Sequence, residues 1–407
     1  MSEEFPVFWE AARGGNVRDV DGNEYLDLTS AFGVALAGHA HPRVAAAISA
    51  QSDRLLHGMG DVHPPEAKLE LLERITALAP WKHARAVLAN TGAEAVEIAL
   101  KTALLATGRP GILAFERCYH GLTLGALAVT NRALFRGPFE ERLYRGVVRA
   151  PFPMEREGPA ALRSALDAVE RMLARAADDG SPIGCVMVEP IQGRGGARVP
   201  APGFMAGVTE RARAAGAVLV FDEVLTGFGR TGRVFAHEHE GVVPDLLCVG
   251  KALGGGMPLS ACVGSDAVMD AWPTSGGEAI HTSTFLGHPV ACAAANAFLD
   301  VLADEGIVAA AAAKGATLKT GLERGLAGVP GVVDVRGRGL LLGIELEGAG
   351  AGAVVAERAL GEGLLLIPAG ERAEVLELTP PAVLTEAQLD FAIDAVTESV
   401  RRWAAAR

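Results

Sequence analysis

One lysine of this chain stands where a reactive amine could be held. Lys251 follows the apolar run 246–249 and precedes three glycines in DLLCVGKALGGGMPLSA, residues 245–261. The end of a covered strand is a poor place for a solvated ammonium, and glycines let the backbone approach a bulky group closely. The chain has six lysines, and a lysine that loses its proton can attack a carbonyl group. Lys251 is therefore a candidate nucleophile toward an aldehyde.

Other polar side chains stand at the ends of further apolar segments. AVLVFDEV (217–224) carries Asp222 and Glu223 near its end, and GCVMVEP (184–190) carries Glu189. Residues 90–93 precede a helical pattern, and the free N–H groups and dipole of a helix start favour a phosphate. Ligands of open α/β sheets bind beyond the carboxyl ends of the strands. We therefore expect these groups to share one site with Lys251.

Together these groups predict a cofactor. The Lys251 amine would form a Schiff base with an aldehyde, Asp222 would pair with a basic ring nitrogen, and residues 91–93 would hold a phosphate. Pyridoxal 5′-phosphate combines an aldehyde, a ring nitrogen and a phosphate in one molecule. Tyr119, which is followed by His120 and Gly121, could stack on the ring.

Each feature also has a simpler explanation when it is taken alone. A lysine beside glycines is more often solvated than catalytic, and acidic residues that close a strand are commonly loop residues or helix caps. Residues 91–94, Thr-Gly-Ala-Glu, could be an ordinary capped helix start, and Tyr119 with His120 could be a core pair. The combination, and not any single residue, supports the cofactor.

Composition narrows the class of protein. The net charge of −12 argues against nucleic acid as the main partner, because phosphate binding requires a basic surface. No apolar run reaches the roughly 18 residues that cross a bilayer, and the start MSEEFPVFWE lacks the order of a signal peptide. The five cysteines have no CxxC pair, which favours reduced, buried thiols over metal ligands or bridges. We expect a soluble cytoplasmic protein.

The order of elements predicts an α/β fold. Residues 17–28 resemble a hairpin around Asp21-Gly22. Strands are expected at 111–115, 184–190, 217–224, 245–251 and 260–264, with helices at 93–108, 159–177 and 203–215. This alternation is typical of a mostly parallel sheet covered by helices. A long helical region at 289–327, shorter strands and a final helix from 385 indicate a smaller α+β unit.

The same pattern predicts the domain organisation. We expect residues 51–295 to form a large cofactor-binding domain and residues 296–407 a C-terminal small domain. The N-terminal segment, residues 1–50, is expected to join the small domain. No internal repeat or low-complexity linker separates these parts.

At this level of detail the sequence resembles the class III, or subgroup II, aminotransferases of fold type I. The resemblance extends over nearly the whole chain, with the blocks in the family's order and at suitable spacing. The quoted blocks are LDLTSAFGVALAGHAHPRV, NTGAEAVEIALK, CYHGLT, VEPIQGRGG, FDEVLTGFGRTG, PDLLCVGKALGGGMPLSA, HTSTFLGHPVACAAA and GRGLLLGIEL. FDEVLTGFGRTG followed by GKALGGGMPLSA is a highly specific signal.

The resemblance implies a role for each matching residue. Lys251 would carry the cofactor as a Schiff base, Asp222 would hold the ring nitrogen, and Tyr119 would stack on the ring opposite Val224. Thr284 would reach the phosphate of a neighbouring subunit, which implies a homodimer with a shared active site. The residues expected to bind the cofactor also include Thr91, Gly92, Ala93, His120 and Glu189.

Departures from the family pattern bear on the substrate. Arg194 stands where members acting on GABA or ornithine typically have glutamate, and Glu377 stands where they have arginine. The family's ion pair would thus be kept with its charges exchanged. Arg194 would anchor a substrate carboxylate, or the two side chains would merely neutralise each other. Phe32, Leu122 and Leu225 indicate a pocket more apolar than a dicarboxylate requires, which argues against GABA or acetylornithine.

The leading interpretation is amino-group transfer between an amino acid or amine and a keto acid or aldehyde, with Lys251 moving protons. A racemase or epimerase acting on an amino acid is the alternative, because the family hosts it with the same core residues. A decarboxylating relative is a third, weaker candidate. A cofactor-bound scaffold without turnover fits poorly with intact Lys251 and Asp222.

Overall fold

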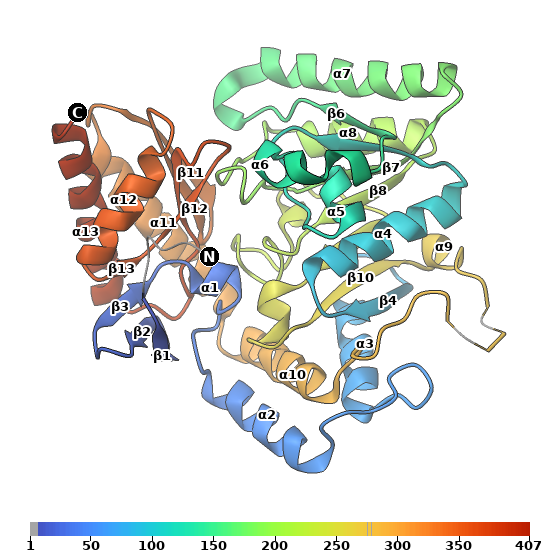
Figure 1. The fold of residues 1–407 in the computed structure, drawn as a ribbon, viewed down its shortest axis with the longest axis horizontal. Helices are drawn as coiled ribbons and strands as arrows, with labels where there is room; N and C mark the ends of the chain where they lie inside the picture. Colours follow the sequence, from blue (N-terminus) through green and yellow to red (C-terminus); the bar gives the residue numbers. More distant parts are fainter. Residues whose placement is uncertain (1–6, 275, 278) are drawn as a thin grey trace.

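The larger part of the molecule is built on a seven-stranded sheet (Figure 1). The computed structural model describes residues 7–274, 276–277 and 279–407, so most of the N-terminal stretch examined for a signal peptide lies outside it. In spatial order the strands are β4 (Ala84–Ala89), β10 (Ser260–Ser265), β9 (Leu246–Val249), β8 (Val218–Asp222), β7 (Ile183–Val188), β5 (Gly111–Phe115) and β6 (Val147–Ala150). All neighbours from β9 to β6 run parallel, whereas β10 is antiparallel to both β4 and β9. The predicted mostly parallel sheet is confirmed.

Helices cover both faces of this sheet. Alternate residues of β8 enter different cores: Leu219 and Phe221 face one, while Val218 and Val220 face the other. This is the two-sided burial that a central parallel strand requires. One face is covered by α4 (Gly92–Thr107), α5 (Leu124–Val129) and α9 (Asp266–Met269). The other is covered by α2 (Pro42–Arg54), α3 (Glu66–Leu78), α7 (Gly158–Asp178), α8 (Phe204–Ala214) and α10 (Pro289–Asp304).

A second group of elements surrounds a separate core at the C-terminal end of the chain (Figure 1). Its main sheet has the order β11 (Val332–Arg338), β12 (Leu341–Leu346), β15 (Val375–Leu378) and β14 (Ile367–Ala369). Its helices are α11 (Ile307–Leu326), α12 (Ala351–Gly361) and α13 (Glu386–Ala405). The N-terminal strands β1 (Trp9–Arg13), β2 (Asn16–Asp19) and β3 (Glu24–Asp27) join it, because β3 pairs in parallel with β13 (Leu364–Leu365).

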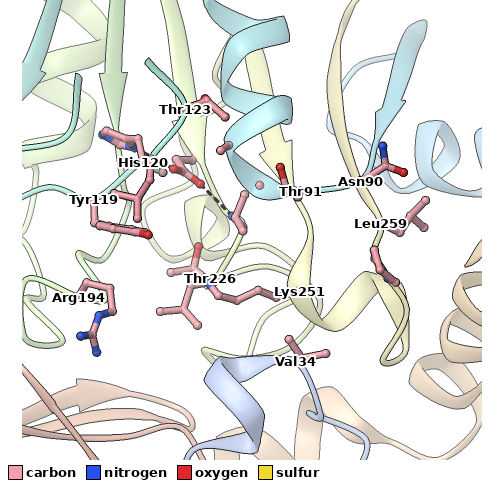
Figure 2. Close-up of a pocket in the computed structure, with 18 of the residues that line it drawn as sticks. Val34, Asn90, Thr91, Tyr119, His120, Thr123, Arg194, Thr226, Lys251 and Leu259 are labelled. Carbon is pink, nitrogen blue, oxygen red and sulfur yellow. Dashed lines mark hydrogen bonds and ion pairs between the residues drawn. The ribbon is translucent and has the colours of Figure 1, made fainter. Parts of the chain in front are cut away.

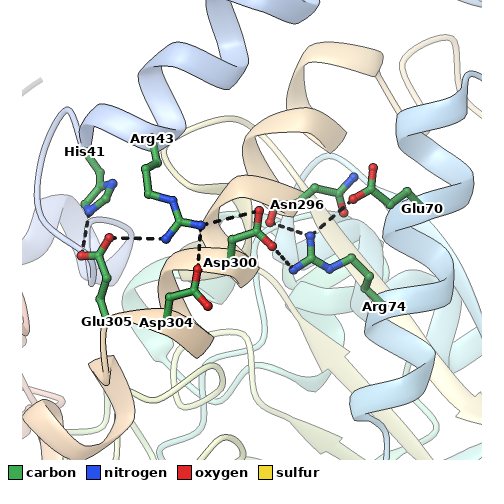
Figure 3. A network of polar contacts seen from close by, with 8 residues as sticks. All are labelled: His41, Arg43, Glu70, Arg74, Asn296, Asp300, Asp304 and Glu305. Atoms are coloured by element: carbon green, nitrogen blue, oxygen red, sulfur yellow. Dashed lines mark hydrogen bonds and ion pairs between the residues drawn. The ribbon is translucent and has the colours of Figure 1, made fainter.

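Ion pairs fasten α2 and α3 to α10 (Figure 3). Arg43 of α2 lies 2.8 Å from Asp304, and Arg74 of α3 lies 2.6 Å from Asp300. Arg74 also donates to the carbonyl of Asn296 at 2.8 Å. Because these side chains are partly exposed, each pair contributes about 0–1 kcal/mol. The network therefore sets the orientation of the helices more than it stabilises the fold.

The helical region predicted at 289–327 consists of two helices, because α10 ends at Asp304 and α11 begins at Ile307. Gly306 lies between them with φ +65°, a left-handed conformation that breaks a helix and suits glycine. The cysteines are all free and buried, as expected. Within the described ranges, no helix is both long and apolar enough to cross a membrane.

Candidate active site

The polar ends of several strands meet at one cavity of about 670 Å³ (Figure 2). Lys251 follows β9, Asp222 closes β8, and Glu189 follows β7. The N-terminus of α4 and the loop between β5 and α5 complete the wall. Of the residues predicted for the site, those that line the cavity are Thr91, Gly92, Ala93, Tyr119, His120, Glu189, Arg194, Asp222, Val224 and Lys251.

The backbone holds Lys251 in a left-handed conformation, with φ +42°, at the start of a short 3-10 turn, Lys251–Gly254. A non-glycine residue in this region costs about 1 kcal/mol, and such strain often accompanies function. Gly33 lies against the side chain: a Cβ at Gly33 would be 3.5 Å from Lys251 Cδ. Burial lowers the pKa of Lys251, and Arg194 lowers it further, whereas the nearby carboxylates of Asp222, Glu377 and Glu189 raise it. The resulting pKa lies below the usual value for lysine.

Asp222 and His120 form a buried pair beside Lys251. His120 Nδ1 lies 2.7 Å from Asp222 Oδ2, and the other carboxylate oxygen accepts from the Val224 amide at 3.1 Å. Burial works against the charged imidazole, but the contacts with Cys118 and Asp222 raise the pKa of His120 well above its usual value. The protonated form of His120 is therefore favoured beside the Asp222 carboxylate.

Glu189 braces two loops of the cavity wall. Its oxygens accept from the Tyr119 amide at 2.9 Å and from the Gly193 amide at 3.0 Å. Burial raises the pKa of Glu189 to about 7, because desolvation outweighs the lowering by His120 and the two amides. Both carboxylate oxygens of Glu189 are thus engaged with the backbone, and the residue positions Tyr119 and the Arg194 loop.

The start of α4 offers unpaired amides to the cavity. Thr91 caps the helix by accepting from the Glu94 amide at 3.2 Å, and Glu94 accepts from the amides of Asn90 and Thr91. The simpler explanation of this segment, a capped helix start, therefore holds as well. No hydrogen bond within the described part of the chain uses the amides of Gly92 or Ala93. Free amides at the start of a helix, together with its dipole, favour a bound anion.

Arg194 and Glu377 do not form the expected ion pair. Arg194 donates from Nη1 to the carbonyl of Pro368 at 3.0 Å, and its own carbonyl accepts from Arg132 at 2.7 Å and from the Gly370 amide at 3.1 Å. Glu377 is buried, and its Oε2 has no hydrogen-bond partner. The prediction of a charge-exchanged pair is corrected, because the Arg194 guanidinium is directed to a carbonyl of the small unit.

Three predicted residues, Phe32, Thr284 and Glu377, do not line the cavity. Phe32 sits in a left-handed turn, α1 (Ser30–Gly33), with φ +62°, and lines a separate pocket of about 430 Å³ with Trp9 and residues 364–368. Thr284 is exposed on the segment before α10 and does not line the 670 Å³ cavity. Within one chain, none of the three side chains contributes to the cavity wall.

Sequence reasoning missed two residues that shape the site. Arg132 is buried and donates to the carbonyls of Arg194 and Gly370, both at 2.7 Å, which joins the cavity loop to the small unit. Thr130 accepts from the His120 amide at 2.9 Å and donates to the Gly121 carbonyl at 3.1 Å. Neither residue belongs to a sequence motif at a strand end. Each acts instead through hydrogen bonds to backbone atoms.

Comparison with known proteins identifies the family. Residues 1–400 match the model of the class-III aminotransferases. The chain belongs to this family. An acetylornithine aminotransferase of Methanothermobacter thermautotrophicus is 37% identical over 96% of this chain and 92% of its own length. One from Mycolicibacterium smegmatis is 39% identical over 96% of this chain and 93% of its own length.

Solved structures agree with this assignment. The ornithine aminotransferase from Toxoplasma gondii ME49 superimposes with a TM-score of 0.88 at 31% identity, covering 99% of this chain and 92% of that chain. The chain is thus a pyridoxal-phosphate-dependent aminotransferase of fold type I, as the sequence predicted. None of these three relatives is named as a racemase or epimerase, so nothing in them favours that alternative.

The described residues fit the cofactor of this family. A primary amine, Lys251, and a buried carboxylate, Asp222, face one cavity whose volume suits a small aromatic phosphate. The amides of Gly92 and Ala93, which have no partner among the described residues, would hold the phosphate. Gly92 also lets the start of α4 lie close to Val224, since a Cβ at Gly92 would be 2.8 Å from Val224 Cγ1.

Proposed function

We propose that this aminotransferase moves an amino group from a donor that carries a carboxylate to a keto acid or aldehyde. The observation that carries the proposal is the meeting of Lys251, the Asp222–His120 pair and Arg194 at one cavity. When bound, pyridoxal phosphate supplies a carbonyl that condenses with amines and a ring that accepts electrons. The side chains bind, orient and move protons around it.

Lys251 is proposed to act as both the general base and the general acid. Because burial lowers the pKa of Lys251, its Nζ is more often neutral than a solvated lysine at the same pH. A neutral Nζ can take a proton from the donor's Cα, and the resulting ammonium can return that proton later in the transfer. The left-handed backbone at Lys251 and the close approach of Gly33 support its placement over the cavity.

Asp222 is proposed to keep the ring nitrogen protonated. Its carboxylate is oriented by His120 Nδ1 at 2.7 Å and by the Val224 amide at 3.1 Å. A carboxylate held by two donors in a buried site favours a cation at its free edge. Glu189 holds Tyr119 in the loop from which its ring would stack on the cofactor, and Val224 would lie against the other face.

Arg194 is proposed to anchor the donor's carboxylate. Its guanidinium lines the cavity and donates one N–H to the Pro368 carbonyl. The other N–H groups of the guanidinium therefore stay available for a bidentate contact. The names of its relatives make acetylornithine a candidate donor. Leu122 and Leu225, which also line the cavity, argue instead for a donor with a less polar body.

A homodimer would complete the site through Thr284. This residue is exposed on the segment before α10, together with Phe285 and Ile280. Exposed apolar side chains beside a site support a subunit interface. Mixing Lys251→Ala with Thr284→Ala subunits tests it: a mixed dimer pairs an intact Lys251 with an intact Thr284 across the interface. Activity above that of either variant alone supports the proposal, and the absence of any gain contradicts it.

We retain the proposed domains, residues 1–50 with the small domain, 51–295 as the large domain and 296–407 as the C-terminal small domain. The pairing of β3 with β13 supports the first assignment. A cytoplasmic location is supported by five free, buried cysteines, which are typical of reducing compartments.

The proposed function is tested by the absorbance of the purified holoenzyme during titration with single donors. A carboxylate-bearing amine should remove the visible band of the cofactor and leave the band of its amine form, and adding a keto acid should restore the first band. Amines without a carboxylate should need higher concentrations. A spectrum that no donor changes, or exchange of the Cα proton in deuterated water without transfer, would contradict amino-group transfer by this mechanism.

A further inference from the structure

A cavity lined by three arginines lies beside β6, the edge strand of the large sheet. This arginine cavity has a volume of about 270 Å³ and is bounded by β6, by α6 (Ala133–Arg136) and by the 3-10 helix Gly137–Arg142 (Figure 1). Its lining residues are Arg136, Glu140, Glu141, Leu143, Tyr144, Arg145, Val147 and Arg149. None of them lines the 670 Å³ active-site cavity, so the two cavities are separate.

Positive charge is in excess in the arginine cavity, although the whole chain carries a net charge of −12. Arg136 and Glu140 neutralise each other, because Arg136 Nη2 lies 2.9 Å from Glu140 Oε1. Among the described residues, neither Arg145 nor Arg149 forms an ion pair. The only other carboxylate of the lining belongs to Glu141, which is exposed. Two unpaired guanidiniums thus stand against one carboxylate, and such an excess attracts anions.

Backbone carbonyls hold two of the three guanidiniums in place. Arg136 Nη1 and Arg149 Nη2 both donate to the carbonyl of Ala128, at 2.7 and 2.6 Å. Both also donate to the carbonyl of Thr130, at 3.1 and 3.5 Å. The two like charges therefore lie close together, and burial, followed by the charge of Arg136, lowers the pKa of Arg149. A bound anion would relieve this repulsion, and little side-chain entropy would be lost because the guanidiniums are already ordered.

Several hydrogen-bond donors of the arginine cavity are unused. Within the described part of the chain, Arg149 Nε and Nη1 donate no hydrogen bond, and the Arg145 guanidinium is likewise without an acceptor. Tyr144 Oη also lacks a described partner and lies over Gly146, where a Cβ would clash with it. Guanidinium groups bind phosphate oxygens in bidentate fashion. A phosphate, with more oxygens and more charge than a carboxylate, matches these donors better.

We propose that the arginine cavity is a binding site for a phosphate group, either free or carried by a small molecule. The guanidiniums of Arg145 and Arg149 would bind the phosphate oxygens, and Tyr144 would donate a further hydrogen bond. A volume of about 270 Å³ restricts the ligand to a phosphate with a small organic group. The inference goes beyond amino-group transfer, because the site uses no residue of the active-site cavity.

Calorimetry of the holoenzyme with inorganic phosphate and with glycerol 3-phosphate tests the proposal. Both probes report on the same phosphate chemistry, and tighter binding of one of them assigns the site to free or to ester-borne phosphate. Arg145→Gln should weaken the binding of the preferred probe at least about tenfold, the loss expected for a charge-assisted contact. Arg149→Gln should weaken it as strongly. Because Arg149 also holds backbone carbonyls, the exposed Arg145 keeps the test decisive if Arg149→Gln folds poorly.

Arg142→Gln is the matched control. Arg142 is an exposed arginine of the same 3-10 helix that does not line the arginine cavity. Its substitution removes the same charge and should change the affinity by less than about twofold, because solvent screens exposed charges. Arg194→Ala should also leave phosphate binding unchanged, which separates the arginine cavity from the active site.

Three results would overturn the proposal. The first is that neither probe binds to the wild-type holoenzyme. The second is an equal loss of affinity in Arg142→Gln and Arg145→Gln, which would reduce the effect to net charge. The third is a loss in Arg194→Ala with none in Arg145→Gln, which would place the phosphate in the active site.

Discussion

His120 Nδ1 lies 2.7 Å from Asp222 Oδ2, and both side chains are buried at the end of β8. The pair fixes the orientation of the Asp222 carboxylate. The free edge of this carboxylate faces Lys251 and the cavity. His120 is in turn held by Thr130 through its backbone amide. The contact makes the carboxylate part of a rigid support, which is the condition for electrostatic stabilisation without reorganisation.

Replacing Asp222 should therefore slow catalysis more than replacing its neighbour. Asp222→Asn removes the charge opposite the ring nitrogen, and kcat should fall by on the order of 10²–10³. His120→Gln keeps a hydrogen-bond donor near the carboxylate and should cost less. Steady-state kinetics with one carboxylate-bearing donor measures both values. Equal losses in the two variants would mean that Asp222 acts only as a structural partner of His120.

Arg194→Ala should raise the KM of carboxylate-bearing donors by about ten- to hundredfold, the value of a lost charge-assisted contact. Amines without a carboxylate should keep their KM, because they never use the guanidinium. Arg194→Lys, which keeps the charge but loses the planar fork, should fall between. The comparison of donors under identical conditions decides the role. A uniform loss for all amines would assign Arg194 to loop structure through Pro368.

Gly33→Ala should impair both stability and turnover. The position has φ +83°, and the new Cβ would lie 2.6 Å from Leu225 Cδ1 and 3.5 Å from Lys251 Cδ. Gly22→Ala is the control, with φ +88° and no atom within 4 Å. Both variants should lose about 1–2 kcal/mol of unfolding free energy from backbone strain. A lowered kcat is expected in Gly33→Ala alone. An equal kcat in the two variants would mean that the contact between Gly33 and Lys251 does not affect turnover.

Glu223 should make stability depend on pH. Burial raises the pKa of Glu223 to about 7, despite donors from Ala236, His237 and Thr226. Because the folded state then holds this proton more tightly than the unfolded state, the stabilisation is full below about pH 4.5. It is lost as the pH rises to about 7. For a shift of this size the loss is up to about 3 kcal/mol.

The free energies of unfolding of the wild type and Glu223→Gln, measured in urea from pH 5 to pH 8, test this linkage. The value for the variant relative to the wild type should rise with pH up to about 7 and then stay level, since glutamine does not titrate. A difference that stays constant over this range would mean that Glu223 is ionised throughout, held by its three donors.

The sequence is informative about the cofactor site because its groups occupy strand ends. Lys251, Asp222 and Glu189 each follow an apolar segment, and parallel strands bring such ends to one edge. Their convergence on a single cavity needs no knowledge of distant contacts. The mostly parallel sheet follows from the same alternation of strands and helices.

Contacts between the two units are less predictable. The pairing expected between Arg194 and Glu377 depends on how β14 and β15 meet the large unit, and there the Pro368 carbonyl takes the guanidinium. The position of Phe32 depends on a left-handed turn of non-glycine residues, which local preferences disfavour. Arg132 and Thr130 act on carbonyls and amides that any residue could supply.

The central claim, that Lys251 is the amine that holds the cofactor, has one direct test. The holoenzyme is reduced with borohydride, digested and analysed by peptide mass spectrometry, with Lys251→Ala treated in parallel. A pyridoxyl mass on Lys251, absent from the variant, is the predicted result. The same mass on another lysine, or on none while the enzyme still transfers amino groups, would contradict the account.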